Sequence, residues 1–340
     1  MRKIFIHTYN DIISVENLLE GWSEFLGGKR SRDDVQKFEQ NLMLNIIDLH
    51  NVLVNKTYKH SKYEAFNISD PKPRNIHKAK VRDRLLHHAI YRKLYPFFDS
   101  KFIADSYSCR NEKGTHRAIN RLRDFTRIVS KNNTKTVWVL KCDIRKFFAS
   151  IDHEVLIKII NKYILDKQII WLLSVIIRSF HATERNVGLP LGNLTSQLFV
   201  NIYMNEFDQF MKHKIKAKYY IRYADDFVIL SHYKDWLELL LPQIKTFLSE
   251  ELKLELHPKK VSIETIASGV DFLGWIHFPR YRILRTVTKR RIFRGIQDKN
   301  AKPKTVQSYL GLISHGNSKK IQQKIENFIC EINSFYFVEK

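Results

Sequence analysis

Apolar runs separated by a short acidic turn mark the centre of the chain. Residues 219–221 (Tyr-Tyr-Ile) and 227–230 (Phe-Val-Ile-Leu) flank residues 223–226, which read Tyr-Ala-Asp-Asp. Strand-forming residues on both sides of a tight polar turn predict a β-hairpin. Ala-Asp-Asp is nevertheless a poor turn sequence, because two-residue turns favour Asn-Gly or Asp-Gly. The adjacent carboxylates of Asp225 and Asp226 therefore predict chemistry at the tip of this hairpin.

A second apolar run leads to a third carboxylate. Residues 137–140 (Val-Trp-Val-Leu) precede Asp143 and predict a buried strand that ends at this residue. Neighbouring carboxylates stay ionised most simply around a divalent cation that prefers oxygen ligands, such as Mg²⁺. Three of them can bridge two ions about 3.5–4 Å apart, which activates a 3′-hydroxyl and stabilises departing pyrophosphate. The pattern predicts nucleotidyl transfer, although an isolated Asp-Asp pair is also typical of a solvated turn.

Helical periodicity dominates much of the remaining chain. Residues 10–58 predict a helical N-terminal extension, residues 169–177 a buried helix too short to span a bilayer, and residues 236–252 an amphipathic helix. Residues 188–197 place two glycines and a proline ahead of another helix. Glycine lets the backbone come close to a ligand, so this loop is expected to approach a bound nucleotide or template base.

The composition indicates a polyanionic partner. The 340 residues include 58 Lys and Arg against 35 Asp and Glu, a net charge of +23. Such a surplus attracts nucleic acid and makes binding steeply salt-dependent. The N-terminus lacks a signal-peptide pattern, and three separated cysteines without Cys-x-x-Cys spacing predict reduced, buried thiols. We therefore expect a cytoplasmic protein with no membrane-spanning segment.

Three further features allow a chemical and a structural interpretation. The basic segment 71–84 carries seven Lys, Arg or His residues and favours triphosphate binding over a solvated loop. Phe148 lies five residues after Asp143, where its ring can exclude a 2′-hydroxyl or pack in the core beside Phe147. Lys260 is able to protonate departing pyrophosphate or is simply exposed.

In this order, and over nearly the whole chain, the motifs resemble those of a reverse transcriptase. The resemblance rests on a fingers motif at 74–84, a first metal motif at 143–148, a template-contacting motif at 188–197, the catalytic hairpin at 223–226, Lys260, and a primer grip at 272–274. A strand is expected to carry residues 272–275. The basic, aromatic tail from residue 280 suits a lobe that grips a duplex.

The resemblance implies an α+β fold with right-hand polymerase architecture. The palm would hold a ferredoxin-like antiparallel sheet, and the thumb would be mainly helical. The expected parts are an N-terminal extension (1–60), fingers (61–100 and 151–187), a palm (101–150 and 188–278) and a thumb (279–340). No RNase H, maturase or endonuclease domain is expected after the thumb.

The resemblance also implies a role for each matching residue. Two Mg²⁺ ions, with Mn²⁺ as a possible substitute, would be held by Asp143, Asp225, Asp226 and the Ile144 carbonyl. The nucleotide would be bound by Arg74, Lys80, Arg82, Ile144, Phe148, Leu191 and Gly192, with Phe148 selecting the sugar. Lys260 would complete the catalytic set, and Phe272, Leu273 and Gly274 would hold the primer. Template RNA, primer, cDNA and dNTPs are the implied partners.

One departure from the general motif indicates a subtype. Most members of the superfamily have Gln-Gly followed by Ser-Pro, whereas this chain has Leu191-Gly192 followed by Ser196-Gln197. This is similar to reverse transcriptases of diversity-generating retroelements, which are encoded by bacteria, archaea or phages. Such enzymes copy a template-repeat RNA with errors at template adenines and work with a pentameric accessory variability protein.

The substitution at this position has a physical consequence. Leu191 lacks the hydrogen-bonding amide of glutamine, and losing one such contact costs about 1–3 kcal/mol of discrimination, roughly tenfold to a hundredfold in error rate. This loss explains lower fidelity in general and gives no reason for adenine in particular. Two alternatives stay open: an ordinary-fidelity bacterial reverse transcriptase (group II intron-like, retron or phage-defence), or a catalytically silent RNA-binding protein. The intact aspartates argue against the silent protein.

Overall fold

Helices form the N-terminal part of the structure, a computed structural model that describes residues 4–69, 73–298 and 302–338. Side-chain hydroxyls of Thr8 and Ser14 cap the first two helices, as helix N-termini require. Gly21 lets the second helix approach the fifth, because a Cβ there would lie 3.0 Å from the Ala89 backbone nitrogen. The helical periodicity predicted for residues 10–58 corresponds to α1 (Tyr9–Ile13), α2 (Val15–Phe25), α3 (Asp33–Glu39) and α4 (Leu42–Val54). The fifth helix is α5 (Val81–Asp99).

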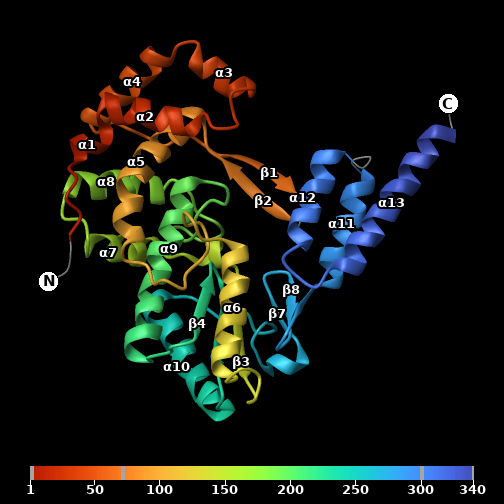
Figure 1. Cartoon of the computed structure of the whole chain (residues 1–340). Coiled ribbons are helices and arrows are strands. Elements are labelled where there is room, and N and C mark those ends of the chain that lie inside the picture. Colours follow the sequence, from red (N-terminus) through yellow and green to blue (C-terminus); the bar gives the residue numbers. More distant parts are fainter. Residues whose placement is uncertain (1–3, 70–72, 299–301, 339–340) are drawn as a thin grey trace.

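A β-hairpin precedes α5. Strands β1 (Glu64–Ile68) and β2 (Arg74–Lys78) pair antiparallel, and Figure 1 shows them projecting toward the side of the molecule that carries the C-terminal helices. Helix α5 begins at Val81, whose side chain is already buried. Pro71 and Lys72 of the basic segment lie outside the described residues.

The central sheet has four antiparallel strands in the order β4-β5-β3-β6. They are β3 (Trp138–Asp143), β4 (Tyr220–Tyr223), β5 (Asp226–Ser231) and β6 (Ser262–Thr265). Helices connect β3 to β4 and β5 to β6, which gives the βαββαβ order and strand arrangement of a ferredoxin-like sheet. The α+β class and the predicted antiparallel sheet are confirmed.

Both faces of this sheet are covered, so β5 is buried continuously instead of alternating between core and solvent. On one face Leu140 and Phe227 join the larger core, to which α9 (Leu194–Gln209) and α10 (Lys234–Leu252) contribute. On the other face Val139 and Val228 join a second core with α6 (Thr115–Val129). The sheet is therefore a rigid central layer between two hydrophobic cores.

Two more helices support α9 from outside the sheet. Asp152 caps α7 (His153–Asn161) by accepting from the Val155 amide at 2.9 Å, and α8 (Lys167–Ile177) packs against α7.

Among the helices of the described residues, we find none with the length and apolar character to cross a bilayer. The short helical turns are η1 (Phe147–Ser150), η2 (Phe210–Lys214) and η3 (Ile266–Ser268).

The expected burial of the cysteines holds for only part of the set. Cys142 is buried on β3, as expected. Cys109 is exposed, and its backbone has a φ of 52°, which places it in a loop rather than in a packed element. The Cys330 side chain lies outside the described part of the structure.

The C-terminal part consists of a small sheet followed by helices. Strands β7 (Val270–Phe272), β8 (Trp275–His277) and β9 (Arg282–Leu284) are antiparallel. The expectation of one strand over 272–275 is wrong, because Leu273 (φ 52°) and Gly274 (φ 85°) form a turn. The sheet crosses the predicted palm–thumb boundary at residue 279. Helices α11 (Thr286–Asp298), α12 (Pro303–Ile313) and α13 (Lys319–Val338) complete the chain.

Candidate active site

The strand register brings the three predicted carboxylates to one end of the central sheet. Asp143 is the direct partner of Asp226 across β3 and β5, and Asp225 lies with Ala224 in the two-residue turn between β4 and β5. The Ile144 amide donates to the Asp225 carbonyl at 3.3 Å, which ties this turn to the end of β3. Two adjacent strands and one turn therefore position all three side chains.

Burial and repulsion raise the pKa values of the two adjacent carboxyls. For Asp225 the largest cause of the raised pKa is removal from water, and the Asp143 charge adds to it. The charges of Lys260 and Arg74 oppose that rise. The pKa of Asp226 is raised first by burial and then by repulsion from Asp225 and Asp143. A cation among these groups would relieve the repulsion.

Lys260 provides such a positive charge in the structure. Its Nζ lies 2.9 Å from Oδ1 and 2.9 Å from Oδ2 of Asp143. Two backbone bonds position the lysine: the His257 amide donates to the Asp143 carbonyl at 2.8 Å, and the Lys260 amide donates to the His257 carbonyl at 3.0 Å. Lys260 therefore neutralises a predicted metal ligand in the protein alone.

The donor set suits a divalent cation. Carboxylate oxygens are the ligands that Mg²⁺ prefers, and all three are held near the same strand ends. Within residues 4–69, 73–298 and 302–338, no group of three or more His, Cys, Asp or Glu side chains already converges in a geometry that would hold a metal ion. The Asp143 carboxylate instead contacts Lys260 through both oxygens.

A buried ion pair lies directly behind the Ala224–Asp225 turn, and the sequence analysis missed it. Arg222 on β4 donates to both carboxylate oxygens of Asp208 on α9, at 2.8 and 2.6 Å, and both side chains are fully buried. Its Nη1 donates to the Ala224 carbonyl at 3.2 Å. Ala224 has a φ of 56°, a left-handed conformation that a residue with a Cβ disfavours. The signal in the sequence was a charged residue inside each of two apolar segments.

The predicted template-contacting loop (188–197) is hydrogen-bonded to the segment 144–148 that follows Asp143. The Leu189 amide donates to the Phe148 carbonyl at 2.7 Å, and the half-buried Phe148 ring packs edge-on against Phe147 at 5.6 Å. Phe148 therefore packs against the core and also keeps part of its surface exposed. The loop and the predicted sugar-selecting residue form one unit.

The same loop also contacts the β1–β2 hairpin. The His77 amide donates to the Leu191 carbonyl at 3.0 Å, and Asn193 Nδ2 donates to the His77 carbonyl at 2.8 Å. Gly192 has a φ of 98°, and a Cβ there would come within 2.8 Å of Ile76 Cγ2. Glycine is therefore required where the hairpin and the loop meet.

The three predicted triphosphate ligands have different surroundings. Arg74, exposed on β2, lies close enough to Asp225 for its charge to offset part of the rise in that carboxyl's pKa. Lys80 forms an ion pair with Glu64. Arg82 donates to the Lys59 carbonyl at 2.7 Å. Arg74 is thus the one of the three whose charge reaches the carboxylates.

The predicted primer grip is the turn of the β7–β8 hairpin. Phe272 is buried beneath it, and the Gly274 carbonyl accepts from the Arg285 amide at 3.1 Å. Leu273 adopts a positive φ without being glycine, which is uncommon for a bulky residue. The tip is therefore a rigid turn that connects the small sheet to the start of α11.

The ferredoxin-like sheet and the helices around it give the chain right-hand polymerase architecture. The solved structure of apo telomerase from Candida tropicalis, truncated from its C-terminal domain, has this fold in common with the chain, with a TM-score of 0.50 at 13% identity. The match covers 72% of this chain and 60% of that one. Residues 61–277 match the family described as reverse transcriptase (RNA-dependent DNA polymerase). The chain belongs to this family, whose members generally use divalent metal ions.

Several curated proteins are similar to this chain in sequence. Protein YkfC of Escherichia coli is 27% identical over 57% of this chain and 60% of its own length. The group II intron-encoded protein LtrA of Lactococcus lactis is 23% identical over 73% of this chain and 49% of its own length. A putative COX1/OXI3 intron 2 protein of Saccharomyces cerevisiae is 21% identical over 79% of this chain and 38% of its own. The chain thus spans between about a third and two thirds of these proteins.

Proposed function

We propose that this chain is an RNA-directed DNA polymerase that extends a primer along template RNA, using dNTPs. The observation that carries the proposal is the direct pairing of Asp143 with Asp226, next to Asp225 in the turn. Two Mg²⁺ ions, or Mn²⁺ in their place, would be held by these carboxylates and the Ile144 carbonyl and would stabilise the charge that develops during nucleotidyl transfer. The family assignment supports this chemistry.

The surrounding side chains would bind and orient the nucleotide. The charge of Arg74 acts on Asp225, which supports a role for Arg74 in binding the triphosphate. Lys80 and Arg82 add further positive charge on the same segment. Lys260 is 47% exposed at its side chain, so it has the freedom to move from Asp143 to the departing pyrophosphate and donate a proton. Phe148 would exclude a 2′-hydroxyl.

The remaining contacts would hold template and primer. Leu191 and Gly192, fixed between the Phe148 segment and the hairpin, would face the templating base pair. The turn of Phe272, Leu273 and Gly274 would hold the primer strand. In this proposal residues 61–100 and 151–187 act as fingers, 101–150 and 188–278 as palm, and 279–340 as thumb, after an extension over 1–60.

We further propose that the enzyme belongs to a diversity-generating retroelement. Leu191-Gly192 and Ser196-Gln197 support this subtype, since leucine cannot make the amide hydrogen bond of glutamine beside the template. The enzyme would then copy a template-repeat RNA with errors at adenines for mutagenic retrohoming. It would act in the cytoplasm of its host and with a pentameric accessory variability protein.

The relative LtrA favours a second candidate. Its similarity over 73% of this chain supports an ordinary-fidelity reverse transcriptase related to group II introns. The two candidates share their chemistry and differ in error spectrum. Sequencing the product therefore separates them.

The deciding experiment is extension of a primed RNA template with Mg²⁺, followed by deep sequencing of the cDNA. We expect Asp225→Asn to abolish extension while RNA binding persists, because the carboxylate and not the fold is removed. Asp235→Asn, on the exposed start of α10, is the matched control and should extend normally. Undiminished synthesis by Asp225→Asn would overturn the assignment of the carboxylates.

The same assay tests the subtype. Errors concentrated at template adenines, reduced in Leu191→Gln, would support the diversity-generating enzyme. The exposed Leu165 offers a control, Leu165→Gln, that should leave the spectrum unchanged. Accurate cDNA from the unmodified chain, also in the presence of an accessory partner, would assign it to the ordinary-fidelity group.

A further inference from the structure

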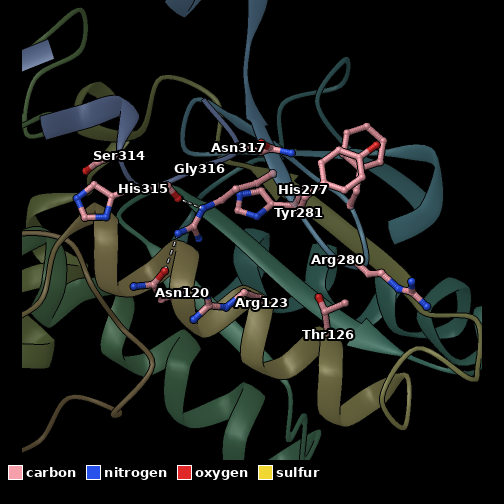
Figure 2. A pocket seen from close by; sticks show the side chains of 12 residues that line it. Asn120, Arg123, Thr126, His277, Arg280, Tyr281, Ser314, His315, Gly316 and Asn317 are labelled. Atoms are coloured by element: carbon pink, nitrogen blue, oxygen red, sulfur yellow. Dashed lines mark hydrogen bonds between the residues drawn. The ribbon is translucent and has the colours of Figure 1, made fainter. Parts of the chain in front are cut away.

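A basic pocket lies where α6, the β8–β9 turn and the α12–α13 turn meet. Its volume is about 570 Å³. Figure 2 shows Asn120 and Arg123 projecting from the same helix, with His315 on the opposite side and Arg280 at the far edge. The pocket is assembled from segments that are far apart in the sequence.

One of the buried side chains that line this pocket is a guanidinium, and within the described residues no carboxylate forms an ion pair with it. Arg282 is 8% exposed. Its Nη2 donates to Asn120 Oδ1 at 2.7 Å and its Nε to the His315 carbonyl. Its Nη1 is buried and has no hydrogen-bond partner within the described residues. A buried donor without an acceptor is costly, and the cost is greater for a charged group, so this site favours an anion.

The other lining residues add positive charge. Arg123 and Arg280 line the pocket with Arg282, and no Asp or Glu appears among the described residues that line it. Arg123 Nε lies 3.8 Å from Asp124 Oδ1, and both side chains are about half exposed. This contact leaves the Arg123 guanidinium accessible to a ligand.

The pocket walls are held together by direct bonds. The Asn317 amide donates to the Arg282 carbonyl at 2.9 Å, and the His315 imidazole stacks on His116 of α6 at 3.6 Å. A Cβ at Gly316 would come within 2.0 Å of the Trp275 ring. The arginines are therefore presented by a fixed frame rather than by a loose surface loop.

The pocket is separate from the residues assigned to polymerisation. Strand β8 begins after the Leu273–Gly274 turn and ends before residues 278–281. The two turns therefore lie at opposite ends of this strand. The lining contains neither the three aspartates nor Lys260.

From this arrangement we propose that the pocket is a phosphate-binding site in which Arg282 and Arg123 contact one phosphoryl group, while Arg280 adds positive charge at the edge of the pocket. Arginine forks match phosphate oxygens, and the side-chain amide of Asn120 adds a neutral donor. The group is either a phosphodiester of bound nucleic acid or a free phosphate. The inference rests on the pocket alone and does not require the proposed polymerase activity.

The test uses the full chain with EDTA present and two probes. One is ³²P-labelled inorganic phosphate in equilibrium dialysis. The other is a labelled twelve-nucleotide DNA without terminal phosphates, followed by fluorescence anisotropy over a range of NaCl concentrations. We expect Arg123→Gln combined with Arg280→Gln to weaken binding of at least one probe about tenfold, the effect of losing a charged hydrogen bond. For the oligonucleotide, the salt slope should fall by about 0.7 per lost contact.

Both arginines of this double variant lie at the accessible part of the pocket and support no buried bond, so the fold is expected to persist. Arg117→Gln, exposed on α6 and outside the lining, is the matched control. Loss of phosphate binding alone identifies a free phosphate, and loss of oligonucleotide affinity identifies a backbone phosphodiester. Unchanged binding of both probes, or an equal loss in Arg117→Gln, overturns the proposal.

Discussion

Two buried arginines on β-strands have opposite surroundings. Arg222 on β4 is fully buried and meets both oxygens of Asp208. Arg282 on β9 is nearly as buried, yet it contacts a carbonyl and an amide oxygen and leaves Nη1 unpaired. The guanidinium of Arg222 is therefore paired with a carboxylate of the same chain, whereas that of Arg282 has no such partner within the described residues.

The pKa values of the two guanidinium groups differ accordingly. Burial alone would lower the pKa of Arg222, but the Asp208 charge outweighs it and the pKa is raised. Burial lowers the pKa of Arg282, repulsion from Arg123 lowers it further, and the charge of Asp124 offsets only part of this fall. A satisfied buried charge serves the fold, whereas an unsatisfied one is available for a ligand.

The largest expected effect comes from removing the Asp208 charge. Asp208→Asn leaves Arg222 charged and buried without a carboxylate, which should cost about 3–5 kcal/mol of unfolding free energy. Urea denaturation followed by circular dichroism measures this loss. Extension should also fall, because the Ala224 carbonyl loses a fixed donor.

Two comparisons show whether the effect belongs to the buried pair. Glu154→Gln breaks the exposed Arg178–Glu154 pair at 2.7 Å and should cost less than about 1 kcal/mol. Arg222→Met combined with Asp208→Leu should recover part of the stability, since no unpaired charge remains, but not the extension activity. A loss below about 1 kcal/mol in Asp208→Asn would remove the distinction between the two arginines.

A smaller effect is expected at Arg282. Arg282→Met removes two hydrogen bonds and should cost about 1–2 kcal/mol, less than Asp208→Asn. Phosphate at ten times its Kd should stabilise the unmodified protein by about 1.4 kcal/mol and leave this variant unchanged. Thermal unfolding of both proteins in phosphate and in chloride at equal ionic strength measures the cost of the substitution and the stabilisation by phosphate. Equal stabilisation of the two proteins would contradict the anion site.

The smallest effect is expected at the turn that Arg222 holds. Ala224→Gly removes the Cβ that disfavours a φ of 56°, and should stabilise the fold by at most about 1 kcal/mol. If Arg222 fixes the turn, extension should change less than twofold. Differential scanning calorimetry and the extension assay give both quantities, and a tenfold loss of activity would show that the Ala224 methyl group itself is needed.

The sequence alone predicted the β-hairpin around residues 223–226. Apolar runs beside the acidic turn predicted the strands that the structure contains, because local pattern and burial agree there. The α+β class and the family followed from the order of the motifs. The strand register, which decides that Asp143 faces Asp226, became visible only in the structure.

Long-range contacts explain what the sequence did not reveal. Arg222 and Asp208 are fourteen positions apart, and Arg282 and Asn120 are separated by 162 positions, so no local pattern joins them. The bidentate contact of Lys260 with Asp143 likewise depends on how the segment after α10 returns to β3. The positive φ of Leu273 broke the expected strand because a bulky residue gave no sign of a turn.

The attachments of the C-terminal helices limit how they move. The Arg285 amide holds the Gly274 carbonyl before α11, and the Asn317 amide holds the Arg282 carbonyl after α12. The segment that carries α11 and α12 is therefore tied to the small sheet at both of its ends, and the stacked imidazoles of His116 and His315 tie the turn after α12 to α6 as well.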